Sequence, residues 1–218
     1  MPNIFLPVLF VLLSLVQLWT CLKEKHELRK PTKVMLMPVL ALCYMSFAEE
    51  PSELVTAGLL LGSLGDLALL WPLNEKTFLA GVAAFCAGHV CYLINIFGRY
   101  TISAGAVWTA VISAVYFAGC IVVFIATKNS MPRAVRIPSF LYMLVLAAVS
   151  ACTLLVLISG ATAGRAVAFA GATLFLCSDG ILCQMLFIKK SEPPKVNFLV
   201  MLTYILGQAM MAAGWAMA

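Results

Sequence analysis

Eight long apolar segments constrain this chain more than any single motif does. They lie at residues 3–22, 34–48, 54–71, 78–98, 103–127, 137–159, 163–188 and 196–217. A helix needs about 20 apolar residues to cross the hydrocarbon core of a bilayer. The composition agrees, since 63% of the 218 residues are hydrophobic and 11% are charged, against about 25% charged in soluble domains. The sequence therefore predicts an all-α polytopic membrane protein, a bundle of eight transmembrane helices in a single domain over 1–218. It excludes a water-soluble globule, a disordered chain and a nucleic-acid-binding domain.

The basic residues predict the orientation. Twelve of the 14 Lys and Arg residues fall between segments 1 and 2, 3 and 4, 5 and 6, or 7 and 8, whereas Arg99 and Arg165 fall on the other side. Because loops rich in Lys and Arg stay in the cytoplasm, we expect both termini on the non-cytoplasmic side. The first segment has no basic residue before it, so we expect an uncleaved signal anchor.

Two aspartates stand apart from the other acidic residues. Seven of the nine Asp and Glu residues lie in loops or at segment ends, but Asp66 and Asp179 lie inside segments 3 and 7. An aspartate at the centre of a membrane helix costs about 2.5–3.5 kcal/mol on insertion scales, so such residues usually mark function. The segments offer these carboxyls one basic partner, His89, which leaves at least one of them without a counter-ion.

A few other polar side chains accompany the aspartates inside the segments. Those that we expect near a site are His89, Tyr92, Ser178, Tyr204 and Gln208. Around Asp66 the chain reads GSLGDLAL, and around Asp179 it reads LCSDGIL. The two segments are four apart and therefore parallel, which is compatible with a duplication of four helices. The small residues of the first motif also favour close helix packing.

The available side chains restrict the chemistry. Two histidines in the whole chain exclude an intramembrane zinc site of three histidines, and no GxSxG motif points to a serine hydrolase. Asp66, Asp179 and His89 could still form a carboxylate-rich metal site, although we expect no metal and no cofactor. Two carboxyls in a site of low dielectric hold protons unequally, so one can stay protonated while the other is ionised. That pair suits C–O cleavage through an oxocarbenium ion.

Four motifs together resemble a known family. They are GSLGDLALLW (62–71), FLAGVAAFCAGHVCYLINIFG (78–98), GATLFLCSDGILC (171–183) and LTYILGQAM (202–210). In this order they resemble the lysoplasmalogenase, or YhhN-like, family of integral membrane enzymes. The resemblance implies an eight-span ether hydrolase that cleaves the vinyl-ether bond of lysoplasmalogens to a fatty aldehyde and a glycerophospho-base. The head groups that it implies are choline and ethanolamine.

The resemblance also implies roles for the polar residues. Asp66 and Asp179 divide the roles of catalytic acid and of base or cation stabiliser, in an order that the sequence leaves open. His89, Tyr92, Ser178, Tyr204 and Gln208 orient water and the glycerol hydroxyl. Lys33 and Lys76 meet the phosphate, or simply flank the spans on the basic side. The expected partners are a lysophospholipid, water and membrane lipids, in a bacterial inner membrane or the endoplasmic reticulum membrane.

Two other functions use the same features. A proton-coupled transporter would also place carboxyls in the membrane, and a lipid-binding scaffold would need no catalytic group. The shape of the cavity discriminates between the enzyme and the transporter. A polar pocket closed at one end and holding both aspartates favours the enzyme, whereas a passage open to both faces favours transport.

Overall fold

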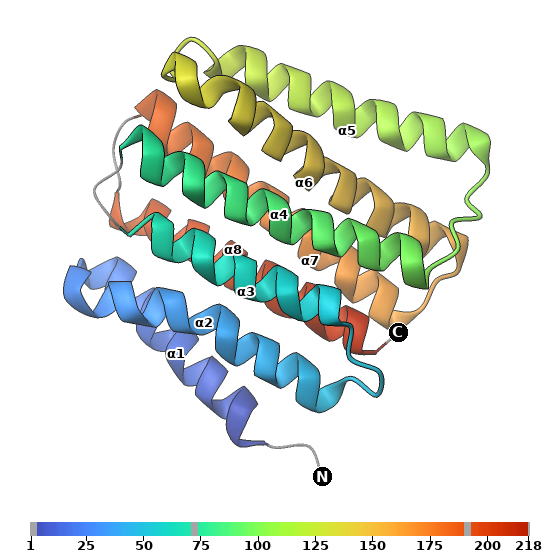
Figure 1. Cartoon of the computed structure of the whole chain (residues 1–218), viewed down its shortest axis with the longest axis horizontal. Helices are drawn as coiled ribbons and strands as arrows, with labels where there is room; N and C mark the ends of the chain where they lie inside the picture. Colours follow the sequence, from blue (N-terminus) through green and yellow to red (C-terminus); the bar gives the residue numbers. More distant parts are fainter. Residues whose placement is uncertain (1–3, 71–73, 190–192, 218) are drawn as a thin grey trace.

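Each predicted apolar segment forms a helix in the computed structural model, which describes residues 4–70, 74–189 and 193–217 (Figure 1). The helices are α1 (Phe5–Lys23), α2 (His26–Phe47), α3 (Glu53–Ala68), α4 (Glu75–Arg99), α5 (Ala106–Thr127), α6 (Arg133–Ser159), α7 (Ala163–Cys183) and α8 (Pro194–Ala216). A π-helical segment, η1 (Gln184–Lys189), continues α7. The described residues contain no strand, so the prediction of an all-α fold is confirmed.

Two helix ends differ from the prediction in ways that affect the site. Helix α2 begins at His26, eight residues before the predicted start at residue 34. The added turns hold Leu, Arg and Lys side chains, which favour helices although they are not all apolar. Helix α3 ends at Ala68, and Trp71, the predicted end of that span, lies outside the described residues. As a result Lys33 lies within a helix, and Asp66 lies near the end of one.

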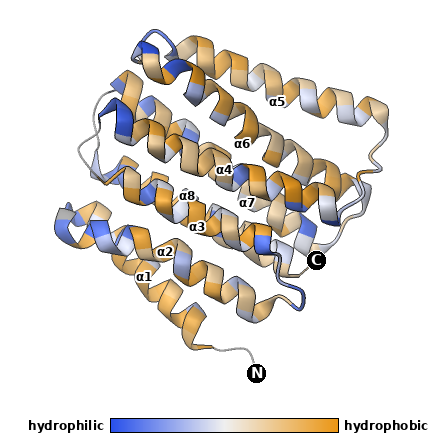
Figure 2. Ribbon diagram, viewed as in Figure 1, coloured by the Kyte–Doolittle hydropathy of each residue, from blue (hydrophilic) through white to orange (hydrophobic). Residues whose placement is uncertain are grey.

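Six of the helices are long and apolar enough to cross a membrane, namely α1, α4, α5, α6, α7 with η1, and α8. Helix α3 has 16 residues, and α2 carries basic residues in its first turns. Both nevertheless run alongside the other helices (Figure 1). Hydrophilic residues gather toward the helix ends, and hydrophobic ones fill the middle (Figure 2). The chain is therefore a polytopic all-α membrane protein.

Glycines let two pairs of neighbouring helices, α3 with α4 and α7 with α8, pack backbone to backbone. A Cβ at Gly88 of α4 would lie 2.8 Å from the carbonyl oxygen of Gly58 on α3. A Cβ at Gly171 of α7 would lie 2.7 Å from the carbonyl oxygen of Gly207 on α8. Small residues at such crossings permit the close contact that drives helix association in lipid. These two pairs form the most closely packed part of the bundle.

The outer helices α1 and α5 are held unequally. Helix α1 packs against α2 and α8, whereas α5 packs closely against α6 and makes a short contact with η1 among the described elements. Much of α5 faces outward, through Val107, Trp108, Val111, Val115, Phe117, Val122 and Ile125. In Figure 1, α5 accordingly lies along one edge of the bundle. It forms an outer wall rather than part of the core.

Candidate active site

One cavity of about 390 Å³ opens within the half of the bundle that contains the basic end of α2. Residues from α2, α3, α4, α5, α6, α7, η1 and α8 line it, and most of them are hydrophobic. Its charged lining residues are Arg29, Lys33, Asp66 and Asp179. The two aspartates that the sequence singled out therefore face one shared space, although 113 positions separate them in the chain.

Asp66 is held by two partners and is 1% exposed. The Lys33 ammonium lies 3.0 Å from its Oδ1 atom, and the Tyr204 hydroxyl donates a hydrogen bond of 2.6 Å to Oδ2. The expectation that the spans offer the aspartates no basic partner besides His89 is wrong for Asp66. The reason is the early start of α2, which brings Lys33 alongside α3. Both oxygens of this carboxyl face donors, an arrangement that favours the ionised form.

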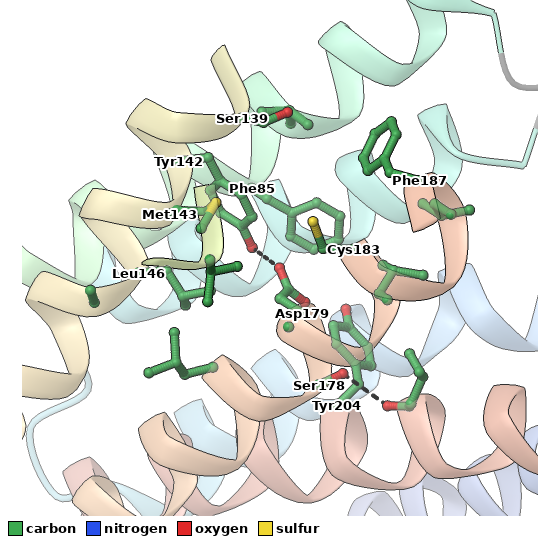
Figure 3. Close-up of a pocket in the computed structure, with 18 of the residues that line it drawn as sticks. Phe85, Ser139, Tyr142, Met143, Leu146, Ser178, Asp179, Cys183, Phe187 and Tyr204 are labelled. Carbon is green, nitrogen blue, oxygen red and sulfur yellow. Dashed lines mark hydrogen bonds between the residues drawn. The ribbon is translucent and has the colours of Figure 1, made fainter. Parts of the chain in front are cut away.

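Asp179 has a different environment. The Tyr142 hydroxyl donates a hydrogen bond of 2.5 Å to its Oδ2 atom (Figure 3). The residue is half-buried, so part of its surface faces the cavity. Among the described residues no Lys or Arg nitrogen lies within 4.0 Å of this carboxyl. A carboxyl bonded to a phenol in an apolar cavity can remain neutral, because burial disfavours its charge and it lacks the close ion pair that Asp66 has.

Tyr142 is a site residue that the sequence does not single out. It lies in the first part of the apolar segment 137–159, where a single tyrosine resembles an ordinary core aromatic. The Phe85 ring lies 6.4 Å from the rings of both Tyr142 and Tyr204, centroid to centroid. It therefore lies between the hydroxyl partners of the two aspartates. Ser139, one turn before Tyr142, also lines the cavity, and its buried Oγ atom has no partner among the described residues.

Three predicted site residues lie in a layer outside the cavity lining. They are His89, Tyr92 and Gln208, each at most 2% exposed. The Tyr92 hydroxyl donates a hydrogen bond of 3.0 Å to the Gln208 Oε1 atom, which joins α4 to α8. The His89 Nδ1 atom lies 2.9 Å from the Phe85 carbonyl oxygen, and its ring stacks near Phe175 at 4.7 Å. These three side chains pack behind the aromatic residues that line the cavity, and they do not line it themselves.

The remaining predicted residues have three different positions: one in the cavity wall, one paired with Asp66 and one on the surface. Ser178 lines the cavity, but its hydroxyl donates to the Val200 carbonyl oxygen at 2.9 Å and so joins α7 to α8 (Figure 3). Lys33 lines the cavity as the counter-ion of Asp66. Lys76 lies exposed in the first turn of α4, outside the lining residues. Arg29, one turn before Lys33, does line the cavity, and its guanidinium lies 3.5 Å from the Asn197 Oδ1 atom.

The metal-site alternative depended on Asp66, Asp179 and His89 meeting at one point. No three His, Cys, Asp or Glu side chains in the described ranges are arranged to hold a metal ion. The His89 ring lies in the aromatic layer, and it does not line the cavity that the two carboxyls share.

Comparisons with known proteins agree with the motifs. The model of the YhhN family matches residues 26–215. Over 184 residues the chain is 29% identical to the protein named Lysoplasmalogenase TMEM86B from Sus scrofa, an alignment that covers 82% of this chain and 72% of that protein. No solved structure matches.

Proposed function

Because this chain belongs to the YhhN family, we propose that it is a membrane hydrolase that cleaves the vinyl-ether bond of lysoplasmalogens. The products are a fatty aldehyde and a glycerophospho-base. The observation that carries the proposal is the pair of unlike aspartates in one apolar cavity, one ion-paired and the other bonded to a phenol. The name of the pig relative supports the choice of substrate class.

In the proposed mechanism Asp179 is the acid. Tyr142 donates to its Oδ2 atom, which leaves Oδ1 to carry the transferable proton. That proton adds to the β-carbon of the vinyl ether, and the electrons of the double bond form the new C–H bond. The α-carbon becomes an oxocarbenium ion, and Asp179 becomes a carboxylate. Exposure to the cavity allows this residue to touch the substrate.

Asp66 stabilises the cation that results. Its negative charge is fixed in place by Lys33 and Tyr204, so no reorganisation is needed when positive charge develops nearby. Water then adds to the oxocarbenium carbon and gives up a proton to the Asp179 carboxylate, which regenerates the acid. The hemiacetal collapses as its hydroxyl loses a proton and the glycerol oxygen gains one, leaving the aldehyde and the alcohol. The Ser139 hydroxyl lies in the cavity wall and can orient the water.

The phosphate of the substrate is assigned to Arg29. A guanidinium matches phosphate oxygens through two parallel hydrogen bonds, and Arg29 lines the cavity at the basic end of α2. This assignment modifies the expectation for Lys33 and Lys76. Lys33 is engaged by Asp66, and Lys76 lies outside the cavity lining.

We also propose that all eight helices span the membrane, with the basic ends facing the cytoplasm. The parallel course of α2 and α3 beside the six apolar helices supports this count (Figure 1). The connections from α1 to α2 and from α5 to α6 carry Lys25 and Lys128, and the adjoining helix turns carry Lys23, Arg29 and Arg133, at one end of the bundle. In this orientation the cavity serves the cytoplasmic leaflet.

The extent of the cavity favours hydrolysis over proton-coupled transport. The layer of His89, Tyr92, Phe175 and Gln208 is at most 2% exposed and lies between the main cavity and a small one of about 10 Å³ near Tyr100 and Trp215. A transporter needs a path that reaches both faces. A pocket closed behind the aspartates suits a reaction that takes substrate from one leaflet.

The test is mass spectrometry of the products after purified protein is incubated with 1-alkenyl and 1-acyl lysophospholipids. The proposal predicts free aldehyde from the alkenyl lipid, with one oxygen from labelled water in the aldehyde because water attacks the α-carbon. Release of fatty acid from the acyl lipid, without cleavage of the alkenyl lipid, would replace it with a lysophospholipase.

A further inference from the structure

We propose that a lateral opening between α5 and α7 admits the hydrocarbon chain of the lipid and holds it during the reaction. The inference rests on the proposed function for the identity of the lipid, but its geometry belongs to the fold. It assigns the chain-binding subsite, which the catalytic residues alone do not locate.

Helices α5 and α7 run parallel and both line the cavity, yet they approach each other at two separated points. At the first point the Tyr116 and Thr173 side chains lie close to each other. At the second, Thr127 interacts with the Cys183 thiol. Eleven residues separate Tyr116 from Thr127, which corresponds to about 16 Å along a helix at 1.5 Å per residue. Between these contacts α5 and α7 bound the cavity from opposite sides.

Two glycines edge this interval, one on each helix. Gly119 of α5 and Gly180 of α7 both line the cavity, and a Cβ added at either would have no atom within 4 Å. This differs from the glycines of the α7–α8 crossing, where an added Cβ would strike backbone. The two glycines therefore do not serve helix packing. Their lack of side chains leaves the space between the helices open.

The edges of the opening are suited to hydrocarbon. Val115 and Val123 on α5 and Leu176 and Leu182 on α7 line the cavity there, with no charged side chain from either helix except Asp179. Val115 is 64% exposed, so the lining continues onto the surface that faces lipid. A single alkyl chain fits such a surface because its transfer from the bilayer to the opening exchanges one apolar contact for another.

The opening also leads directly to the reacting group. Gly180 follows Asp179 in the chain, and the carboxyl points toward Tyr142 on α6 (Figure 3). Arg29 and Lys33 line the same cavity from α2. A lipid whose chain lies between α5 and α7 and whose phosphate reaches α2 must place its vinyl ether in the space shared by the aspartates. The subsite therefore accounts for the position of the bond that is cleaved.

Blocking the opening tests the inference. Gly119→Trp adds bulk where an added Cβ meets no atom within 4 Å, and it replaces a residue that weakens helices. We expect it to lower kcat/KM for a long-chain alkenyl lysophospholipid by about ten-fold or more, while the rate with a water-soluble analogue bearing a four-carbon alkenyl chain changes less than about two-fold. The matched control is Gly98→Trp on α4, where an added Cβ also meets open space outside the cavity. Equal loss with both substrates, or equal loss in the control, would overturn the subsite.

A second measurement needs no turnover and therefore separates this inference from the proposed function. A non-cleavable 1-alkyl lysophospholipid with a diazirine near the end of its chain is photo-crosslinked to the wild-type protein in bilayers, and the labelled peptides are mapped. Label on α5 and α7 around Gly119 and Gly180, at least about five-fold above label on the lipid-exposed face of α1, supports the subsite even if no aldehyde is ever released. Label spread evenly over α1 and α5, or confined to other helices, contradicts it.

Discussion

The two aspartates occupy similar places in sequence and in the fold, yet their partners differ. Asp66 on α3 faces an ammonium and a hydroxyl, whereas Asp179 on α7 faces a single hydroxyl and the open cavity. The same side chain is thus ion-paired at one position and hydrogen-bonded to a tyrosine at the other, which fits the proposed roles of anion and acid. In the proposed mechanism the neighbouring helix, rather than the motif around each aspartate, decides the role of the carboxyl.

The neighbouring helices occupy equivalent positions in the two halves of the chain. Lys33 comes from α2, just before α3, and Tyr142 comes from α6, just before α7. This parallel fits the duplication suggested by the two motifs, which stays a prediction. The halves differ at their outer helices, since α1 packs on α8 while α5 packs closely on α6. That difference leaves the second half open to lipid on the side of the residue assigned as the acid.

The largest expected effect comes from removing either carboxyl. Asp179→Ala and Asp66→Ala should each lower kcat by about 10³-fold, since acid–base and charge-stabilising groups contribute 10²–10⁴-fold. The measurement is the rate of aldehyde release by each purified variant. Wild-type activity in either variant, if it folds as the wild-type protein does, would contradict a catalytic role for that aspartate.

Breaking the ion pair should affect stability as well as activity. Lys33→Met leaves the Asp66 carboxylate buried without its counter-ion, which costs about 3–5 kcal/mol for a buried pair. We therefore expect a clear fall in Tm in detergent. The double variant Lys33→Met/Asp66→Asn removes both charges, so its Tm should lie above that of Lys33→Met alone. Additive losses of stability would mean that the two groups do not form a buried pair.

Removal of the Tyr142 hydroxyl should lower kcat more than removal of the Tyr204 hydroxyl. Tyr142→Phe removes the hydrogen bond found on Asp179 and should lower kcat by roughly 30-fold, which corresponds to about 2 kcal/mol. Tyr204→Phe should lower kcat by roughly five-fold, because Lys33 still holds Asp66. Steady-state kinetics with KM and kcat separated provides the measurement, and near-equal KM values in both variants provide the control. A larger fall in kcat for Tyr204→Phe than for Tyr142→Phe would contradict the proposed difference between the two aspartates.

The basic residues outside the ion pair should affect substrate binding rather than the chemical step. Arg29→Ala should raise KM about ten-fold with kcat nearly unchanged, since it removes a phosphate contact that is equal in the ground and transition states. Lys76→Ala is the matched control and should leave both constants within about two-fold, because the residue is exposed and lies outside the cavity. A KM effect at Lys76 with none at Arg29 would reassign the phosphate site.

Most of the fold follows from the sequence because the membrane permits few solutions. A long apolar run must satisfy its own backbone, so it forms a helix, and seven of the eight helices begin within four residues of the predicted position. The start of α2 was predicted too late because apolar content stops at Val34 while helix-forming residues continue before it. That single boundary hid the partner of Asp66.

Site residues could be predicted from the sequence where the residue type is rare inside membrane helices, and not where it is common. An aspartate inside a membrane helix has few structural explanations, so Asp66 and Asp179 could be singled out. A tyrosine has many explanations, and nothing local distinguishes Tyr142 from a core aromatic. His89, Tyr92 and Gln208 were grouped with the aspartates because they are polar, but helix packing places them in the layer behind the cavity. Which helix faces which is a tertiary property that spacing within one segment does not contain.

Measuring which of the two carboxyls is protonated tests the proposed roles most directly. Infrared spectra of the purified protein at neutral pH report a protonated carboxyl by its C=O stretch, which shifts when H₂O is replaced by D₂O. We predict one such band in the wild-type protein, retained in Asp66→Asn and lost in Asp179→Asn. A band that persists in Asp179→Asn and disappears in Asp66→Asn, or no band in the wild-type protein, would contradict the division of roles between the two aspartates.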